Sequence, residues 1–183
     1  MPQQLFPTIL TLCNFVGGVL AIYAVFEQKF GVAIICISLG LLFDVFDGWT
    51  ARKLNAVSTF GQELDSLADI VTFGVAPAIL AYQLVLSDLG QLGLSIALLY
   101  SIGAVLRLAR FNAMQSDLPT FVGLPVPVAA IGLLLSVALM SPWLVLINSC
   151  LFAWLMVSHV KFPHFKKNKL DGDEVHDVHK SVN

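Results

Sequence analysis

The stretch Asp44–Asp69, DVFDGWTARKLNAVSTFGQELDSLAD, decides how this 183-residue chain folds and what it can bind. It holds four aspartates inside a sequence that is otherwise mostly apolar. Asp44 and Asp47 are three residues apart at the end of one apolar run, and Asp65 and Asp69 are four apart at the start of the next. Because residues three or four apart share a helix face, two helices joined by a short connection would aim all four carboxylates at one point.

Four carboxylates gathered in an apolar protein predict a cation site. Close anions repel one another, and burying even one ionised carboxylate is costly. Divalent cations would offset both costs, and a ligand set made only of oxygen favours hard ions such as Mg²⁺ or Mn²⁺. The candidate metal ligands are therefore Asp44, Asp47, Asp65 and Asp69.

The composition places most of the chain in a membrane. Hydrophobic residues make up 57% of it and charged residues 12%, whereas a soluble domain averages about 25% charged residues. The cysteines Cys13, Cys36 and Cys150 are far apart in apolar runs, and we interpret them as small hydrophobic residues. The first apolar run lacks the flanking features of a signal peptide, so we expect it to be a retained span.

Six apolar runs approach the length of about 20 residues that a bilayer span needs. They cover residues 8–26, 30–50, 60–86, 89–109, 126–140 and 143–160. We therefore expect an all-α polytopic membrane protein, a bundle of six transmembrane helices. This membrane domain would cover residues 1–169, and a polar tail would cover 170–183. Pro77, with Gly74 just before it, predicts a kink in the third span.

The positive charges predict the orientation in the membrane. Nine of the ten Lys and Arg residues follow the second, fourth or sixth span, and only Lys29 lies on the opposite side. By the positive-inside rule, both termini are then cytoplasmic. The aspartates also lie at cytoplasmic helix ends, close to the lipid headgroups. We therefore expect a multi-pass protein of the cytoplasmic membrane whose site is open to the cytosol.

Small residues and an arginine accompany the aspartates. Gly48 follows the second aspartate directly, and Gly61 lies one turn before the third. Together with Ala51 they leave room for a ligand to come close, and Arg52 can grip a phosphate with two N–H bonds. This combination indicates a substrate that carries a pyrophosphate. A proton or ion path in a transporter, or a structural ion-pair network, are the alternatives that intramembrane aspartates also fit.

Other polar residues flank this stretch. Arg107 and Arg110 end the fourth span, where they could bind a substrate carboxylate or phosphate, or could anchor the helix at the headgroups and offset its dipole. We expect the hydroxyls of Ser66 and Thr72 to bond the backbone of their own helix, and Glu63 to be solvated.

The first span carries one amide inside the membrane, Asn14, which needs a partner and could face the aspartates. Gly17 and Gly18 follow it and permit close helix packing.

Eight residues of the central stretch fill the pattern D-x2-D-G-x2-A-R-x8-G-x3-D-x3-D. This pattern resembles the signature of the CDP-alcohol phosphotransferase family. Four further segments are similar to the serine-accepting branch of that family: TLCNFVGG in the first span, DIVTFGVAPA after the fourth aspartate, LRLARFN at 106–112 and FVGLPVPVAA at 121–130. The resemblance covers nearly the whole chain apart from the tail.

The resemblance implies a six-helix membrane enzyme that transfers the phosphatidyl group of CDP-diacylglycerol to the hydroxyl of L-serine and releases CMP. Three aspartates, Asp44, Asp47 and Asp65, would hold a divalent ion, and Asp69 would complete a two-metal site and act as the general base. The CDP part of the donor would be lined by Gly48, Ala51, Arg52 and Gly61. Membrane lipids and a second copy of the chain, in a homodimer, are the further partners implied, with no nucleic acid.

The choice of acceptor rests on few residues. A phosphorylated acceptor would need additional cationic groups, and only Arg107 and Arg110 are obvious candidates. We therefore expect an acceptor without a phosphate, serine, and expect these two arginines to bind it. Glycerol 3-phosphate and inositol phosphate are the nearest alternative acceptors. An ion- or proton-coupled transporter is the alternative from another class, but no acidic residue continues the path from the aspartates toward the other face.

Overall fold

The computed structural model describes residues 2–114, 123–139 and 141–158, and over these residues the chain is helical with no strand. The elements in order are α1 (Pro2–Phe26), α2 (Phe30–Lys53), α3 (Thr59–Asp69), η1 (Ile70–Val75), α4 (Ala76–Leu84), η2 (Leu86–Leu89), α5 (Gln91–Met114), α6 (Val126–Ala138) and α7 (Pro142–Val157). The all-α class is thus confirmed. The polar tail expected at 170–183, and the ends of the fifth and sixth expected spans, lie outside the described residues.

Four helical stretches among the described residues are long and apolar enough to cross a membrane. They are Leu5–Phe26, Phe30–Lys53, Thr59–Leu84 and Gln91–Ala113. Helices α6 and α7 are also apolar but have only 13 and 16 residues. The chain is an integral membrane protein, and the count of six spans stays a prediction.

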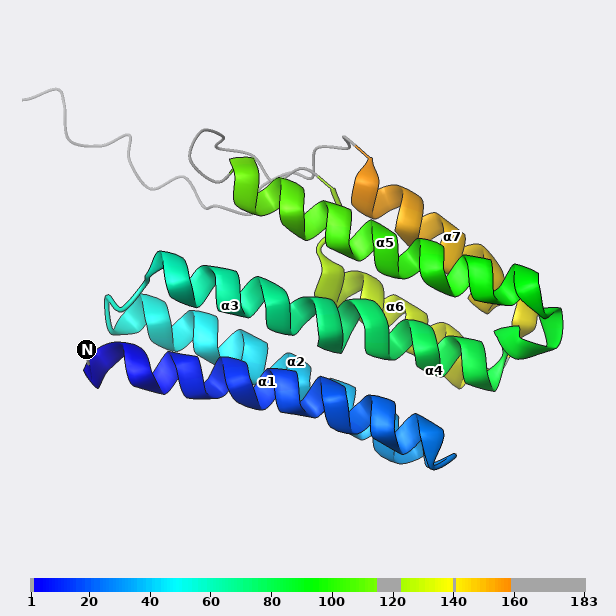
Figure 1. Ribbon diagram of the computed structural model, residues 1–183, viewed down its shortest axis with the longest axis horizontal. Helices are drawn as coiled ribbons and strands as arrows, with labels where there is room; N and C mark the ends of the chain where they lie inside the picture. The colour runs from blue at the N-terminus through cyan, green and yellow to red at the C-terminus, as the bar shows by residue number, and fades with distance from the viewer. Residues whose placement is uncertain (1, 115–122, 140, 159–183) are drawn as a thin grey trace, which may run out of the picture.

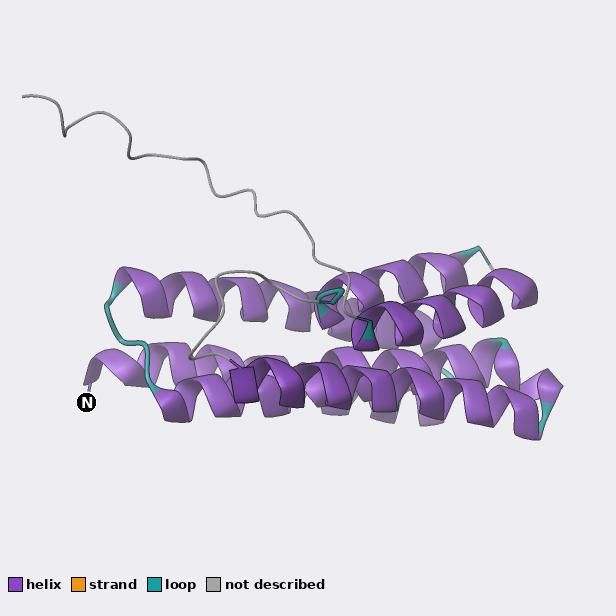
Figure 2. Ribbon diagram, turned by 90° about the horizontal axis from the view of Figure 1, so that it is seen from above, coloured by secondary structure: helices purple, strands orange, loops and turns teal. Residues whose placement is uncertain are grey.

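The helices lie side by side along one long axis (Figure 1; Figure 2). Helix α1 packs mainly on α2, and α5 packs mainly on α7. Between these two pairs lies a continuous rod made of α3, η1 and α4, with α6 against its second half. The rod therefore touches most of the other helices, and it carries two of the four aspartates.

The rod changes its geometry directly after the second of these aspartates. Ile70–Val75 is π-helical, and the N–H of Ala76 donates to the carbonyl of Val71, five residues back. A π-helical turn is commonly a single interruption inside an α-helix. Pro77 explains the position, because it has no N–H with which to continue the α-helical pattern. The sequence predicted a kink at this proline, and the structure has a π-helical segment there.

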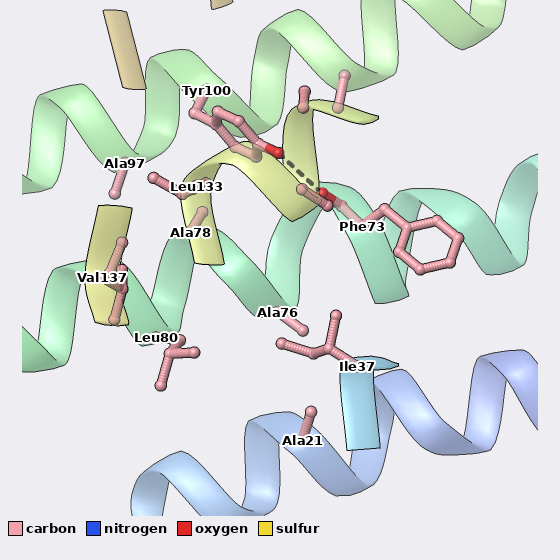
Figure 3. Packing of buried hydrophobic residues seen from close by; sticks show 14 of the residues in the cluster. Ala21, Ile37, Phe73, Ala76, Ala78, Leu80, Ala97, Tyr100, Leu133 and Val137 are labelled. Atoms are coloured by element: carbon pink, nitrogen blue, oxygen red, sulfur yellow. Dashed lines mark hydrogen bonds between the residues drawn. The ribbon is translucent and has the colours of Figure 1, made fainter. Parts of the chain in front are cut away.

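Side chains of α5 bond two backbone carbonyls of this π-helical segment. Tyr100 donates its hydroxyl proton to the carbonyl of Phe73 at 3.2 Å (Figure 3). Ser101 Oγ lies 3.2 Å from the carbonyl of Gly74 and can donate to it. In a membrane a backbone carbonyl has no water to bond, so neighbouring side chains must satisfy it. These contacts fix the rod against α5.

Two glycines bring α1 and α2 close to the rod. A Cβ at Gly18 would lie 2.5 Å from Oγ1 and 2.8 Å from Cα of Thr72, which is too close for any side chain. A Cβ at Gly40, on α2, would lie 2.6 Å from Cγ2 of the same threonine. The close packing predicted for the glycines of the first span is therefore confirmed at Gly18, and it brings α1 against the beginning of η1.

Candidate active site

Helices α2 and α3 bring three of the four aspartates together. Carboxylate oxygens of Asp44, Asp47 and Asp65 lie within 4.8 Å of one another, and we call these three residues the carboxylate triad. The connection between the two helices is only residues 54–58. Ser58 ends it as the cap of α3, where its Oγ accepts the N–H of Gly61 at 3.1 Å. This cap fixes where α3 begins and so which residues face α2.

The triad fits a divalent cation. Magnesium and calcium take oxygen ligands at about 2.0–2.6 Å, so two ligands of one ion lie no more than about 4–5 Å apart. The triad is close to that spacing. Asp65 Oδ1 is buried without a hydrogen-bond partner among the described residues, which is costly for a carboxylate unless a cation binds it. The triad therefore fits a divalent cation, whereas Asp69, the fourth aspartate that the spacing predicted at the same point, does not belong to this group.

Asp69 stands apart from the triad. It is the last residue of α3, one turn beyond Asp65, and it is buried. Its Oδ1 accepts a hydrogen bond from Nδ2 of Asn14 at 3.1 Å. It is still close enough to Asp44 and Asp65 for their charges to repel it. The structure thus distinguishes one aspartate, held by an amide, from three that converge.

A cavity of about 350 Å³ adjoins the triad. Its wall comes from the beginning of α1, the end of α2, the short connection and α3. The four residues predicted to line the donor site all lie in this wall, together with two members of the triad: Gly48, Ala51, Arg52, Gly61, Asp47 and Asp65. The wall also includes polar residues of α1 and α3 that the sequence pattern did not single out, namely Thr8, Thr11 and Gln62.

Arg52 folds back along α2 toward the triad. A Cβ at Gly48 would lie 3.5 Å and 3.7 Å from the two terminal nitrogens of its guanidinium. The glycine therefore leaves the space over which this guanidinium lies. Since Arg52 is exposed and lines the cavity, its planar fork can donate to a phosphate held beside the carboxylates.

The two arginines of α5 have different surroundings. Arg107 is 9% exposed, and its Nε has no hydrogen-bond partner among the described residues. It is close enough to Asp69 for their opposite charges to attract. Arg110 instead donates from Nη2 to the carbonyl of Val157, the last residue of α7. Because the last carbonyls of a helix lack helical donors, Arg110 ties the end of α7 to α5.

Three polar residues connect α3 and α5 by hydrogen bonds. Ser66 Oγ donates to Oδ1 of Asn112 at 3.1 Å, and Nδ2 of Asn112 donates to Glu63 at 3.0 Å. The prediction that Ser66 and Thr72 bond their own helix was wrong, because Thr72 Oγ1 donates to the carbonyl of Asn14, in α1, at 2.9 Å. Glu63 is exposed, as expected. Neighbouring helices lie close enough at this end to offer partners that sequence spacing does not reveal.

These features define a helical membrane protein that gathers carboxylates and an arginine around one cavity, an arrangement suited to a cation and a phosphate group side by side. The model of the CDP-alcohol phosphatidyltransferase family matches residues 4–160, and the chain belongs to that family. The resemblance indicated by the signature residues is thereby confirmed.

Three curated relatives from distant organisms carry the same name. The chain is 48% identical over 168 residues to the CDP-diacylglycerol–serine O-phosphatidyltransferase of Bacillus subtilis, which covers 92% of this chain and 95% of the relative. It is 37% identical over 179 residues to the protein of that name in Helicobacter pylori, covering 92% and 76%. It is 38% identical over 156 residues to that of Methanocaldococcus jannaschii, covering 85% and 72%. The similarity to the serine-accepting branch is therefore also confirmed.

Proposed function

We propose that this protein transfers the phosphatidyl group of CDP-diacylglycerol to the hydroxyl of L-serine and releases CMP. The observation that carries the proposal is the convergence of Asp44, Asp47 and Asp65 beside a cavity lined by Arg52. The chain that places them there is 48% identical to a relative named for this reaction, over nearly the full length of both.

The carboxylate triad would hold a divalent ion, Mg²⁺ or Mn²⁺, and Asp69 would complete a site for a second. When bound, such ions neutralise the negative charge that grows on the leaving group as the pyrophosphate is cleaved. The unpartnered, buried Oδ1 of Asp65 supports this assignment. Family membership supports it as well, since the family is in general dependent on divalent metals.

The donor would bind with its cytidine and phosphates in the cavity beside the triad. A volume of about 350 Å³ is within the size range of small-ligand sites. Gly48, Ala51 and Gly61 line it without bulky side chains, and Arg52 would donate two N–H bonds to a phosphate. The acyl chains would stay in the lipid, because the helices around the site expose large apolar side chains.

The acceptor would bind between Asp69 and the end of α5. Arg107 lies close to Asp69 with an unpartnered Nε, so a serine carboxylate at Arg107 would bring the serine hydroxyl near Asp69. Arg110 is the second candidate for that carboxylate, through its buried Nη1, which has no hydrogen-bond partner among the described residues. No third cation is needed for an acceptor without a phosphate.

The reaction then needs one proton acceptor. The serine oxygen forms a bond to the phosphorus on the diacylglycerol side, and Asp69 takes the hydroxyl proton. The bond from that phosphorus to the bridging oxygen breaks, and CMP leaves with its electron pair. A carboxylate within hydrogen-bond reach of the hydroxyl can accept the proton as it becomes acidic during attack.

We also propose six spans, with α6 and α7 as short ones, and a homodimer. Both termini and the site would then be cytoplasmic. The arginines Arg52, Arg107 and Arg110 all lie at the end of the bundle that holds the site, and Lys29 lies at the opposite end of α2, which supports this orientation. The homodimer rests on the resemblance to the family alone.

The test is release of CMP from CDP-diacylglycerol by the purified protein in detergent, with Mg²⁺ or Mn²⁺, with and without L-serine. We expect release only when metal and serine are both present. Release that needs glycerol 3-phosphate or inositol phosphate instead of serine would overturn the acceptor. No turnover with any metal, together with ion flux into proteoliposomes that Asp65→Ala abolishes, would identify a transporter.

A further inference from the structure

Two polar side chains of α1 reach the aspartates, one from each of two consecutive turns. Thr11 Oγ1 donates to Oδ2 of Asp47 at 2.8 Å, and Asn14 Nδ2 donates to Oδ1 of Asp69 at 3.1 Å. Thr11 Oγ1 also lies 3.1 Å from the carbonyl of Pro7, but its single proton can serve one acceptor, and the carboxylate is closer and charged. The first helix thus contacts one aspartate on each of α2 and α3.

The burial of Asn14 is difficult to explain by packing alone. The side chain is 0% exposed, and its Oδ1 has no hydrogen-bond partner among the described residues. An unpaired buried carbonyl destabilises a fold, whereas an apolar side chain of similar size would avoid that cost. What an apolar side chain could not supply is the N–H bond to Asp69.

The backbone around Asn14 is held in place from the other side. Its carbonyl accepts the hydroxyl proton of Thr72 at 2.9 Å. Gly18, one turn later, allows α1 to approach the same threonine more closely than any other residue would. The backbone of Asn14 is therefore hydrogen-bonded to η1, the segment that begins directly after Asp69.

We infer that Asn14 is the positioning residue for Asp69. By bonding Oδ1, its amide holds this carboxylate apart from the triad and leaves Oδ2 as the atom that can take a proton from the acceptor. Thr11 has the corresponding role for the triad, because its hydrogen bond orients Asp47 as a metal ligand. This inference rests on the proposed function, in which Asp69 is the base.

Two substitutions separate the positioning role from a merely structural one. Asn14→Leu keeps the volume of the side chain and removes the donor, and Asn14→Ala also removes the volume. In both we expect kcat for CMP release to fall about 10- to 100-fold, the usual cost of losing a partner that orients a ligand. The KM for CDP-diacylglycerol should change less than about threefold, because Asn14 does not line the cavity proposed for the donor.

The second readout is binding of Mn²⁺, followed by electron paramagnetic resonance on the purified protein without substrate. Asn14→Leu should leave the affinity of the triad for its first ion unchanged. Thr11→Val, which keeps shape and removes the hydroxyl, should weaken that affinity about 10-fold or more. A lower kcat with unchanged Mn²⁺ affinity in Asn14→Leu, together with a weaker Mn²⁺ affinity in Thr11→Val, would support separate roles. Asn14 would then act on Asp69, and Thr11 on the triad.

Asn148→Ala is the matched control. Asn148 Nδ2 donates to Oγ of Ser136 at 2.5 Å, in a polar pair between α6 and α7 that has no member in the cavity wall. It should lower the thermal midpoint, because it removes a hydrogen bond between two helices, and leave kcat unchanged.

The inference is overturned if Asn14→Leu and Asn14→Ala keep kcat within about threefold of the wild type. It is also overturned if they lose kcat and Mn²⁺ affinity together, since that pattern reports a damaged fold. In either case a wild-type protein that releases CMP with serine leaves the proposed function standing. A wild type that binds Mn²⁺ and releases no CMP under any condition rejects the proposed function, and the role of Asn14 with it.

Discussion

The two halves of the central rod are built on different principles. The first half, α3, has three buried residues, Ser66, Ala68 and Asp69, and two of them are polar. The second half, α4, buries small and apolar residues such as Ala76 and Leu80, both at 0% exposure (Figure 3). Packing fixes α4, whereas hydrogen bonds to α1 and α5 fix α3. One end of the rod is therefore held by packing, and the other end lines the cavity of the candidate site.

This difference has a physical reason. In lipid, close packing of small side chains stabilises helix association, because the surrounding acyl chains are as apolar as the helices. A site for charged groups cannot be made that way. It needs polar partners placed one by one, and α3 obtains them from residues on neighbouring helices. Substitutions at the polar site residues should therefore lower activity more than stability. Substitutions in α4 should lower stability more than activity.

The largest effect is expected from the triad. Asp44→Ala should lower CMP release on the order of 10³-fold, which corresponds to loss of the several kcal/mol that a bound cation supplies. Added Mg²⁺ or Mn²⁺ should no longer change the rate, and the thermal midpoint should not fall. The control is Asp88→Ala, an exposed acid of η2 outside the cavity. A metal-dependent rate in Asp44→Ala would remove this residue from the ligand set.

Next comes the aspartate that stands apart. Asp69→Asn should lower kcat about 10²- to 10⁴-fold, the range expected when a general base is lost. The protein should remain folded and should still bind Mn²⁺ at the triad. Single-turnover kinetics together with Mn²⁺ titration would measure both. Full activity of the asparagine variant would show that the proton goes elsewhere.

A smaller effect is expected at the acceptor. Arg107→Ala should raise the KM for serine about 10- to 100-fold, the range for a lost hydrogen bond to a charged group. The KM for CDP-diacylglycerol should change little. Arg107→Lys should recover part of the loss because it restores the charge without the planar fork. Unchanged serine dependence in Arg107→Ala would make this arginine a structural part of α5.

The smallest effect on activity is expected in the packed half. Leu80→Ala should destabilise the protein by about 2 kcal/mol or more through the cavity it leaves. The kcat of the folded fraction should stay at the wild-type value. Thermal unfolding in detergent and a rate normalised to folded protein would test this. If Leu80→Ala lowered kcat as strongly as a change in α3, the two halves would not be independent.

Sequence spacing was sufficient for the triad because helical periodicity is local. Asp44 and Asp47 face one way on any α-helix, and a short connection leaves Asp65 little choice of direction. The contrast between Arg107 and Arg110 could not be predicted in the same way. It depends on where α7 ends, and no spacing within α5 contains that information.

The contacts made by α1 also depend on tertiary structure. The sequence shows that Asn14 needs a partner in the membrane, but the choice of Asp69 follows from how closely Gly18 lets α1 approach Thr72. Pro77 likewise predicts a kink, but not the π-helical segment that precedes it. The π-helical segment is fixed by the contact with α5, where Tyr100 bonds a freed carbonyl.

Because of that π-helical segment, the direction in which the Asp69 side chain points depends on how many residues separate it from α4. Each residue of an α-helix turns the chain by about 100°, so the number of residues between Asp69 and Pro77 sets the angle between the carboxylate and the anchored half of the rod. Deleting one residue within 70–75 would hardly alter the chain's composition, charge or hydropathy. It would still rotate Asp69 away from Asn14. An insertion or deletion here would change the angle between the Asp69 side chain and α4. A comparison of residue types at single positions would not detect this change.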